Sequence, residues 1–326
     1  MLKNIVTPTR SSCRLPVRLP EQTGGNDEAA GSSDIFNNLL DDRSNRTEPM
    51  LVEIERRLAQ AGIESPRLEA QLLLALATHV RRVDVMRGAL PVLCREQLLE
   101  LESLVSRREK RVPLAYLRGY QEFYGIEFKV APAVLIPRPE TEILVDIALQ
   151  RTCPQSNARI ADIGTGSGCI AISIARHRDQ LQVIATDLSM DALKIAQHNV
   201  NHILSTSSIH LLQADLLSEF ATGSLDGIVA NLPYVSPGEK ERLQPEIRTY
   251  EPDTALYAGP DGLSLIRRLI GQAAIVLRPG GWIALEVGCG QSDSVSGMLE
   301  DRGFSAVFRE KDLAGIERCV GGIKPS

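Results

Sequence analysis

Aromatic residues and long apolar runs are both scarce in this chain. Only 4% of the 326 residues are aromatic, and Trp282 is the single tryptophan. A module that stacks single-stranded nucleic acid on aromatic rings is therefore not expected. No stretch approaches the ~20 consecutive apolar residues that a transmembrane helix needs, so we expect no membrane partner. Positive charge is not in surplus either, because 36 Lys and Arg stand against 41 Asp and Glu, a net charge of −5. This balance argues against binding nucleic acid through overall attraction.

Cysteine chemistry and metal binding have little support. The six cysteines are scattered and form no C-x-x-C pair, which favours free thiols in a reducing compartment. His198 and His202 lie four residues apart, a spacing that two metal ligands on one helix could use. However, no Glu accompanies them in the H-E-x-x-H manner. We expect no metal ion.

The first 20 residues contain no acidic side chain. A basic, hydroxyl-rich start is compatible with an organelle transit peptide, whereas Pro8, Pro16 and Pro20 oppose the amphipathic helix of such a peptide. Residues 21–49 are rich in Gly, Ser, Asn and Asp, as in a linker. We expect residues 1–49 to be a disordered extension. The expected location is the cytoplasm, with the mitochondrion as the alternative if residues 1–49 include a transit peptide.

Residues 50–115 are expected to form a small bundle of three helices. The first helix starts near Met50 and ends at Gly62, and the second starts at Ser65 and Pro66. A third helix is predicted over 93–110. The apolar residues expected to face inward, listed from the first helix to the third, are Leu51, Ile54, Leu58 and Ala61, then Leu68, Leu72, Leu73 and Leu76, then Leu98, Leu101 and Val105. The basic residues assigned to the bundle surface are Arg81, Arg82, Arg87, Arg107, Arg108, Lys110 and Arg111. They form either a solvated surface or a docking face for an acidic or RNA-associated partner.

Residues 116–140 are expected to link this bundle to a second domain over 141–326. Alternating residues at 121–130 predict a β-hairpin around Gly125, and two prolines stiffen the connector at 135–142. Strands are then predicted near 159–163, 182–187, 208–213, 225–230, 282–287, 304–308 and 316–321. Helices are predicted near 168–178, 190–203, 260–277 and 292–302. This alternation specifies an α/β fold with a parallel sheet covered on both faces. The last two strands have no helix between them and are expected to form an antiparallel hairpin.

A glycine-rich loop, DIGTGSG at 162–168, joins the first strand of this domain to its first helix. Glycines there let the backbone turn sharply and approach a ligand. The third glycine comes one residue earlier than in the G-x-G-x-x-G pattern, which weakens a dinucleotide interpretation. Asp162 instead favours contact with the amine of an amino-acid ligand.

Carboxylates are expected at two further strand ends. Asp187 follows the loop by about twenty residues, where doubly wound folds bind ribose hydroxyls. Asp215 ends the third strand and is placed to face an adenine amino group. Together these features predict a nucleoside that carries an amino acid, S-adenosylmethionine (SAM); the alternative is that they only cap helices and turns. The residues assigned to this cofactor are Asp162, Gly164, Thr165, Gly166, Ser167, Gly168, Asp187, Asp215, Leu216 and Asn231.

The segment Asn231-Leu232-Pro233-Tyr234 directly follows the fourth strand and therefore lies at the same sheet edge. An amide or exocyclic amine nitrogen is a poor nucleophile because its lone pair is delocalised. The Asn231 side-chain oxygen and a backbone carbonyl of this segment can accept its two N–H bonds and aim the lone pair at the sulfonium methyl. Tyr234 can stack on a planar acceptor. Asn231, Pro233 and Tyr234 are thus the candidate catalytic residues, and 231–234 is the candidate substrate segment; the alternative is a plain proline turn.

These residues resemble the release factor glutamine methyltransferase family (HemK/PrmC) over about 50–326. The matching stretches are PLAY at 113–116, EFYG at 122–125, LIPRPETE at 135–142, DIGTGSG at 162–168, ATD at 185–187, EP at 251–252, GG at 280–281 and EVG at 286–288. The resemblance implies a class I SAM-dependent, Rossmann-like methyltransferase. Its sheet would have seven mostly parallel strands with an antiparallel C-terminal hairpin, preceded by a helical bundle.

The implied activity is methylation of the side-chain amide nitrogen (N5) of the glutamine in the Gly-Gly-Gln motif of class I peptide chain release factors. Such methylation modulates translation termination. The release factor is then the partner, and we expect no direct contact with nucleic acid and a monomeric enzyme.

Leu232 departs from the Asn-Pro-Pro-Tyr usual in this family. Asn-Leu-Pro-Tyr is typical of rRNA adenine dimethylases, so N6-methylation of rRNA adenine is the alternative function. Against it, those enzymes lack the PRPETE run and carry their extra domain after the catalytic one. A third hypothesis is a catalytically silent SAM-binding module. It predicts that the candidate substrate segment at 231–234, called the acceptor segment below, has been lost, yet Asn231, Pro233 and Tyr234 are all present.

Overall fold

The computed structural model describes residues 47–326, apart from 89, 91, 154–156 and 205–208. The expected extension and its transit-peptide alternative lie outside the described residues, except for 47–49. Those three residues are helical, so the first helix, α2 (Thr47–Gln60), starts earlier than predicted. Pro49 is tolerated because the first-turn N–H groups lack partners in any helix. Glu48 also accepts a hydrogen bond from Arg67 at 2.8 Å, which ties this first turn to the next helix.

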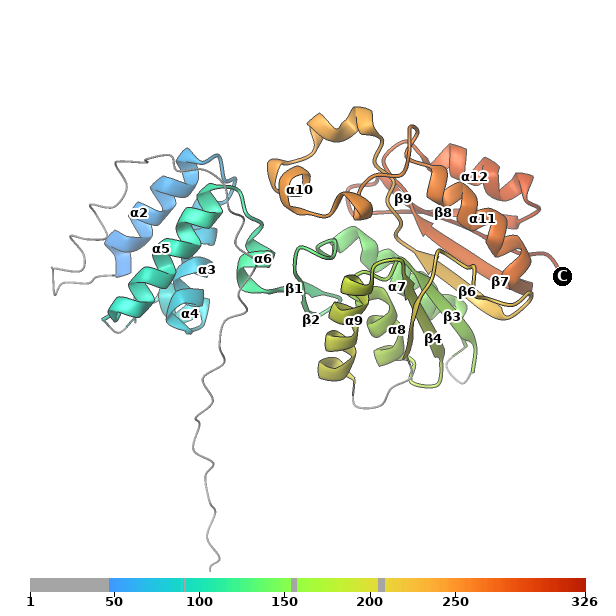
Figure 1. Ribbon diagram of the computed structural model, residues 1–326, viewed down its shortest axis with the longest axis horizontal. Coiled ribbons are helices and arrows are strands. Elements are labelled where there is room, and N and C mark those ends of the chain that lie inside the picture. Colours follow the sequence, from blue (N-terminus) through green and yellow to red (C-terminus); the bar gives the residue numbers. More distant parts are fainter. Residues whose placement is uncertain (1–46, 89, 91, 154–156, 205–208) are drawn as a thin grey trace, which may run out of the picture. The chain divides into compact units, whose positions relative to one another are not determined.

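The helical region contains the three predicted long helices and two short ones that were not predicted. After α2 come α3 (Pro66–Thr78), α4 (Arg82–Met86), α5 (Arg95–Glu109) and α6 (Leu114–Arg118). The helices α2, α3 and α5 lie side by side (Figure 1). Arg57 of α2 is 5% exposed and donates to Glu102 and Glu109 of α5, which joins these two helices by charge as well as by apolar contact.

The predicted buried stripe of the second helix is partly wrong. Leu68 is 39% exposed, and Leu72 and Leu76 are only half-buried. The inward side chains are Ala70, Leu73, Leu74, Ala75, Ala77 and Thr78. Because this helix is apolar on most sides, its periodicity does not select one face. The alanines let α3 pack closely on its neighbours, and this packing decides the face. Ser65 occupies the expected N-cap position but makes no capping hydrogen bond through its side chain.

The assignment of all seven basic residues to the bundle surface is also wrong for two of them. Arg108 is 5% exposed and donates to Glu69 and Glu246. Arg111 is half-buried and donates to Glu246 at 2.7 Å. Carboxylates brought in from two other helices neutralise these arginines, so they are not part of a free basic surface.

The predicted hairpin is confirmed as β1 (Tyr120–Phe123) and β2 (Ile126–Lys129), which pair antiparallel. The turn residues Tyr124 and Gly125 have φ values of 52° and 69°. Positive φ at both positions is what a type I′ turn requires, and this turn matches the twist of the two strands. A 3-10 turn, η1 (Pro139–Thr141), and the helix α7 (Glu142–Arg151) follow.

A seven-stranded sheet with the order β5-β4-β3-β6-β7-β9-β8 forms the centre of the α/β region. Its strands are β3 (Arg159–Ile163), β4 (Gln182–Asp187), β5 (Ile209–Gln213), β6 (Leu225–Ala230), β7 (Leu277–Glu286), β8 (Ser305–Lys311) and β9 (Glu317–Ile323). The strands β3 to β7 pair in parallel, and β9 pairs antiparallel with β7 and β8. The mostly parallel sheet and the antiparallel C-terminal hairpin are therefore confirmed.

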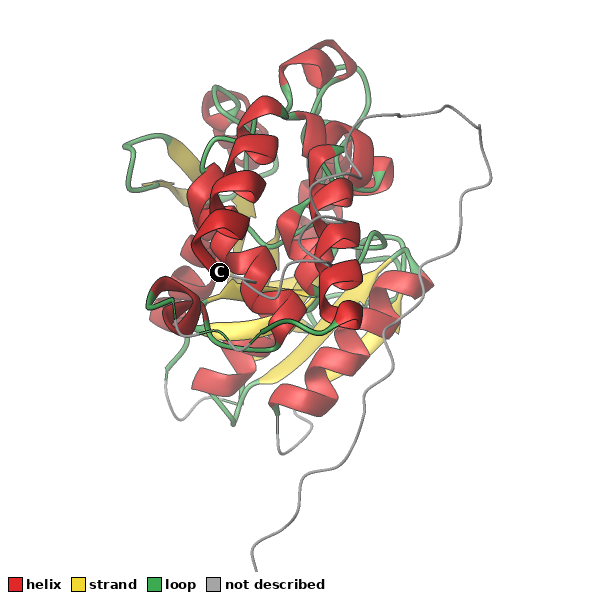
Figure 2. Cartoon of the chain, turned by 90° about the vertical axis from the view of Figure 1, so that its left-hand side faces the viewer, coloured by secondary structure: helices red, strands yellow, loops and turns green. Residues whose placement is uncertain are grey.

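Helices cover both faces of this sheet (Figure 2). Successive strand residues point to opposite faces. On β6, Val229 packs with the core under α7 and α8 (Cys169–His177), whereas Ile228 and Ala230 pack with the core under α11 (Ser264–Val276) and α12 (Ser292–Asp301). The helix α9 (Met190–Ile203) follows β4. Every residue of β6 is buried, and its apolar run at 228–230 is what a central parallel strand requires.

The chain between β6 and α11 holds three short helical turns that were not predicted. They are η2 (Pro237–Arg242), α10 (Pro245–Tyr250) and η3 (Asp253–Ala255). In the described part of the chain, no helix has both the length and the apolar character needed to cross a membrane.

Candidate active site

The strand order places the glycine loop beside the Asn231 segment. The strands β3 and β6 are neighbours, and Ile163 at the end of β3 pairs with Ala230 at the end of β6. The chain leaves β3 toward β4 on one side, while β6 continues toward β7 on the other. Ligands of doubly wound sheets bind at such a reversal, outside the carboxyl ends of the strands. Two segments that lie more than sixty residues apart in sequence thus meet at one edge.

The glycine loop is held open by backbone contacts and by the absence of side chains. The N–H groups of Gly164 and Thr165 both donate to the carbonyl of Thr186, at 2.9 and 2.8 Å. Gly168 has a φ of 81°, and a Cβ there would lie 3.3 Å from Ala196 Cβ of α9. A Cβ on Gly164 would lie 3.0 Å from the Leu232 side chain. The loop therefore packs directly against both α9 and the acceptor segment.

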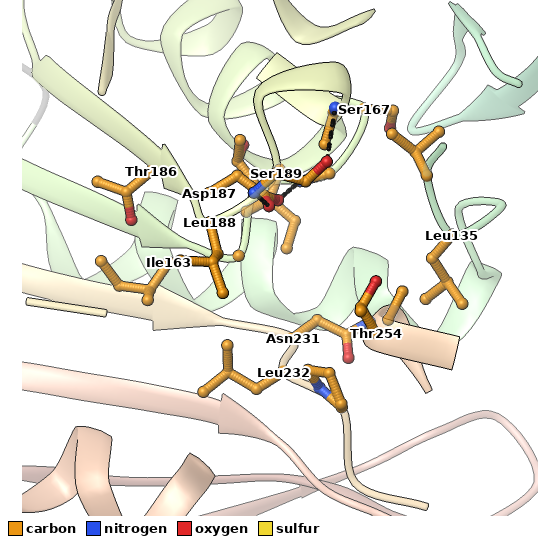
Figure 3. Close-up of a pocket in the computed structure, with 18 of the residues that line it drawn as sticks. Leu135, Ile163, Ser167, Thr186, Asp187, Leu188, Ser189, Asn231, Leu232 and Thr254 are labelled. Atoms are coloured by element: carbon orange, nitrogen blue, oxygen red, sulfur yellow. Dashed lines mark hydrogen bonds between the residues drawn. The ribbon is translucent and has the colours of Figure 1, made fainter. Parts of the chain in front are cut away.

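A cavity of about 370 Å³ opens at this edge. Its volume lies within the range of about 300–1,000 Å³ that is typical of small-molecule sites. Asp187 and Ser189 lie on one side of it and Asn231 and Leu232 on the other (Figure 3). The predicted site residues that line it are Gly164, Thr165, Gly166, Ser167, Asp187, Asp215, Leu216, Asn231, Leu232 and Pro233. Asp162, Gly168 and Tyr234 are not among the lining residues.

Asp162 lies beneath the loop and is fully buried. Its Oδ2 accepts hydrogen bonds from Thr165 Oγ1 at 2.6 Å and from Ala171 N at 3.1 Å. Burial raises the pKa of Asp162 to about 7, and these two hydrogen bonds oppose that shift. Oδ1 has no partner among the described residues. The carboxylate thus supports the loop through Oδ2, from a position that is not part of the cavity lining.

Asp187 connects the loop to the start of α9. It accepts from Gly166 N at 2.9 Å through Oδ2 and from Ser189 N at 2.8 Å through Oδ1. Ser189 in turn caps α9 by accepting from Ala192 N. Burial raises the pKa of Asp187, and its backbone hydrogen bonds counteract part of this effect. A carboxylate has about four acceptor positions, so both oxygens can still receive ligand hydroxyls.

Asp215 and Leu216 lie at a more open part of the cavity. Asp215 is half exposed and pairs with Arg268 at 2.7 Å. Leu216 is buried and has a φ of 55°, a backbone conformation that residues other than glycine rarely adopt. Strained backbone of this kind persists where surrounding structure holds it and is frequent at ligand sites.

Two residues that the sequence analysis did not assign to the site support Asn231 and Tyr234. Asn231 Nδ2 donates to Thr141 Oγ1 at 3.0 Å, and this hydroxyl lies 2.6 Å from Glu286 Oε2. The other carboxylate oxygen, Oε1, accepts from the Tyr234 hydroxyl at 3.3 Å. Glu286 is 3% exposed, and burial raises its pKa to about 7. Glu286 ends a parallel strand beside β6, the same signal that selected Asp162 and Asp187.

Another buried carboxylate holds part of the cavity lining. Glu251 pairs with Arg138, which lines the cavity, and also accepts from Ile136 N at 3.1 Å. Burial raises the pKa of Glu251, while the Arg138 guanidinium lowers it. The PRPETE run therefore serves the site at two points, since Arg138 lines the cavity and Thr141 contacts Asn231.

The residues present fit SAM. Two residues that line the cavity, Ser167 and Thr186, have hydroxyl oxygens without a hydrogen-bond partner among the described residues. Buried polar atoms of this kind usually have a hydrogen-bond partner, and a ligand amine or carboxylate would supply one. Among the described residues, no group of three or more His, Cys, Asp or Glu side chains is arranged to hold a metal ion.

Comparison with known proteins agrees with this geometry. A family model described as PrmC N-terminal domain matches residues 50–119, and one described as Methyltransferase small domain matches 140–247. The protein named "Release factor glutamine methyltransferase" from Geobacter sulfurreducens is 41% identical over 265 residues, which cover 81% of this chain and 92% of that protein. The chain belongs to the release factor glutamine methyltransferase family.

Other members show the same extent of similarity. The protein of this name from Moorella thermoacetica is 41% identical over 82% of this chain and 95% of its own length. The one from Koribacter versatilis is 37% identical over 83% of this chain and 96% of its own length. Since the match includes the helical region before the α/β part, the rRNA adenine methyltransferase alternative is not favoured.

Proposed function

We propose that this protein transfers a methyl group from SAM to N5 of the glutamine in the Gly-Gly-Gln motif of class I peptide chain release factors. The observation that carries this proposal is the state of Asn231. Its Nδ2 is engaged by Thr141, and no group in the described chain donates to its Oδ1. An acceptor for an amide N–H is thus present in the cavity wall, next to the glycine loop.

The chemistry requires orientation rather than a strong base. SAM supplies an electrophilic methyl group on a sulfonium. Asn231 Oδ1 accepts one N–H of the substrate amide, and a backbone carbonyl of the 231–234 segment accepts the other. The nitrogen lone pair is thereby turned out of conjugation and toward the methyl carbon. As the N–C bond forms and the S–C bond breaks, the sulfur keeps the bonding electrons and the nitrogen loses a proton to water. Positioning and electrostatics account for the rate.

Tyr234 and Leu232 shape the acceptor side. Burial raises the pKa of Tyr234, and the nearby Glu286 carboxylate raises it further, so the ring remains a neutral phenol. Leu232 is 4% exposed and contacts the glycine loop. It replaces the rigidity of a second proline with apolar packing, which holds Asn231 at the end of β6.

We also propose that the protein acts as a monomer in the cytoplasm and does not contact nucleic acid directly. The net charge of −5 and the neutralised arginines of α5 support the last point. Light scattering at several concentrations tests the oligomeric state, and fluorescence localisation of the full chain tests the compartment, including the mitochondrial alternative.

The central experiment supplies labelled SAM with a purified release factor and, separately, with ribosomal subunits. We expect label only on the release factor and, by mass spectrometry, the mass gain of one CH₂ group on the Gly-Gly-Gln peptide. A release factor with this glutamine replaced by alanine is the matched control. Label on ribosomal RNA alone would overturn the proposal.

The variant Asn231→Ala tests the acceptor geometry. It removes the carboxamide that orients the nitrogen, so we expect kcat to fall by about 100-fold or more, as for other lost transition-state hydrogen bonds. SAM affinity, measured by calorimetry, should change by about threefold or less. Full activity in this variant would show that another group orients the glutamine.

A further inference from the structure

The Asn231 carboxamide can face its neighbours in two ways, and only one of them exposes the oxygen. If the amide were turned over, Nδ2 would face the acceptor site and would repel the N–H groups of a glutamine. The choice is set by the group that the amide meets inside the protein. That group is the hydroxyl of Thr141, 3.0 Å away and on a residue that is 2% exposed.

A hydroxyl has one proton to donate. Thr141 Oγ1 donates to Glu286 Oε2 at 2.6 Å, and the ionised form of this carboxyl group can only accept. With Glu286 ionised, the Thr141 proton is committed to it, and toward Asn231 the hydroxyl can only accept. The hydroxyl can thus accept a hydrogen bond from Asn231 Nδ2 but has no proton to donate to Oδ1. Oδ1 therefore faces the substrate.

The same carboxylate reaches the other end of the acceptor segment. Glu286 Oε1 accepts from the hydroxyl of Tyr234. Gln291 Nε2 donates to the main-chain carbonyl of Tyr234 at 3.0 Å, and Gln291 Oε1 accepts from Gly288 N. Glu286 thus fixes both Asn231, through Thr141, and Tyr234, directly.

Glu286 has no direct cationic partner, although it is buried. The structure shows no Lys, Arg or His of the described chain within ion-pair distance of its carboxylate. Burying a carboxylate on two hydroxyl groups costs free energy that an apolar residue would avoid. A positional role accounts for its presence at the site.

We infer that Thr141 and Glu286 are positioning residues for methyl transfer, which set the amide orientation of Asn231 and hold the Tyr234 ring. The inference rests on the proposed function for its choice of acceptor. Both act through the acceptor segment: Thr141 contacts Asn231, and Glu286 contacts Thr141 and Tyr234.

The test compares Thr141→Val, which removes the hydroxyl and keeps the shape, with Thr141→Ser, which keeps the hydroxyl. We expect Thr141→Val to lower kcat on the release factor by about 10- to 100-fold, the scale of a misplaced reacting group. SAM affinity and KM for the release factor should stay within about threefold. Thr141→Ser should recover kcat to within about threefold of the unmodified enzyme.

Thr152 provides a matched control. It is also a buried threonine, 5% exposed, and its hydroxyl donates to Ala148 O at 2.6 Å, outside the site. Thr152→Val should leave kcat unchanged. Equal kcat in Thr141→Val and the unmodified enzyme would overturn the inference, as would equal losses in the Val and Ser variants of Thr141.

A second measurement needs no variant of the positioning residues. In ¹⁵N-labelled protein, the side-chain amide signal of Asn231 is assigned by its absence in Asn231→Asp. We expect a nuclear Overhauser effect from one of its amide protons to the Thr141 side chain, and slow exchange of that proton with solvent. Absence of this contact would overturn the inference even if the Thr141 variants failed to fold.

The two measurements also separate the inference from the proposed function. If the unmodified enzyme leaves the release-factor glutamine unlabelled, the proposed function fails. The amide-proton contact would still decide whether Thr141 orients Asn231 for some other acceptor.

Discussion

At the scale of single residues, this site depends on buried carboxylates that lack full charge neutralisation. Asp162 and Glu286 are both nearly inaccessible to solvent, and burial raises the pKa of each to about 7. Each accepts two hydrogen bonds, which recover only part of the hydration free energy lost. These two carboxylates therefore lower the free energy of unfolding, while they hold the glycine loop and the acceptor segment in place.

The raised pKa predicts a pH dependence of stability for Glu286. Its pKa is about 7 in the folded protein and about 4.3 in an unfolded chain, so between these values the folded state binds more protons. The free energy of unfolding should then decrease as pH rises from about 4.5 to 7. We expect Glu286→Gln to flatten this decrease by up to about 3 kcal/mol. Urea denaturation at pH 5 and pH 7.5 measures it, and an identical slope in both proteins would contradict the prediction.

The second residue-scale prediction concerns Asp187. Asp187→Ala removes the acceptor of Gly166 N and the carboxylate assigned to the ribose, so SAM affinity should fall by about tenfold or more, the loss of hydrogen bonds to a charged group. Asp191→Ala is the control, because Asp191 is 71% exposed and pairs only with Lys194. Calorimetric titration with SAM distinguishes the two, and equal affinities in both variants would count against the assigned role.

At the scale of elements, the chain after the acceptor segment folds back and supports it. Val235 N donates to Leu256 O at 2.9 Å, and Ala258 N donates to Val235 O at 3.2 Å. Gly262, just before α11, lies so close that a Cβ there would be 2.2 Å from the Tyr234 carbonyl oxygen. The position of Tyr234 is thus set by a loop almost thirty residues downstream.

Gly262→Ala tests this support. The new Cβ must displace the Tyr234 backbone, so we expect kcat to fall by about tenfold or more, since small misplacements near reacting groups have effects of this size. Gly280→Ala is the matched control, because Gly280 has a similar φ of 77° but no atom within 4 Å of the added Cβ. Both variants should lose about 1 kcal/mol of stability to backbone strain. A normal kcat in Gly262→Ala, assayed on release factor, would refute the support role.

At the scale of the whole molecule, a buried arginine joins the helical region to the α/β region. Arg108 of α5 pairs with Glu69 of α3 and with Glu246 of α10, at 2.5 and 3.0 Å. A further contact joins α10 to the residue directly after α5, because the Tyr250 hydroxyl donates to Lys110 O at 2.7 Å. Glu251, the next residue, holds part of the cavity lining through Arg138.

Arg108→Met tests this connection. It leaves Glu69 without its partner and Glu246 with Arg111 alone, so we expect the free energy of unfolding to fall by about 3 kcal/mol. Arg81→Met should leave the free energy of unfolding nearly unchanged, because its side chain is 77% exposed. Denaturation in urea measures both, and similar losses in the two variants would argue against a buried connection.

Local patterns in the sequence were enough to predict the strands, most helices, the mostly parallel pairing of the sheet and the glycine loop. Each of these follows from residue spacing within about ten to twenty positions, since apolar periodicity and glycine placement act on neighbouring backbone. The strand-end rule also placed Asp187 and Asn231 at one sheet edge. The inward face of α3 was not determined, because a helix that is apolar on most sides has no single preferred face.

Only the tertiary structure decided which side chains serve the site from a distance. Asn231 and Thr141 are separated by 90 residues, and Thr141 and Glu286 by 145, yet hydrogen bonds join them. Arg108 is charged and would be expected at the surface, yet it is buried because carboxylates from two other helices pair with it. Contacts of this kind depend on how complete elements pack, and no local periodicity encodes them.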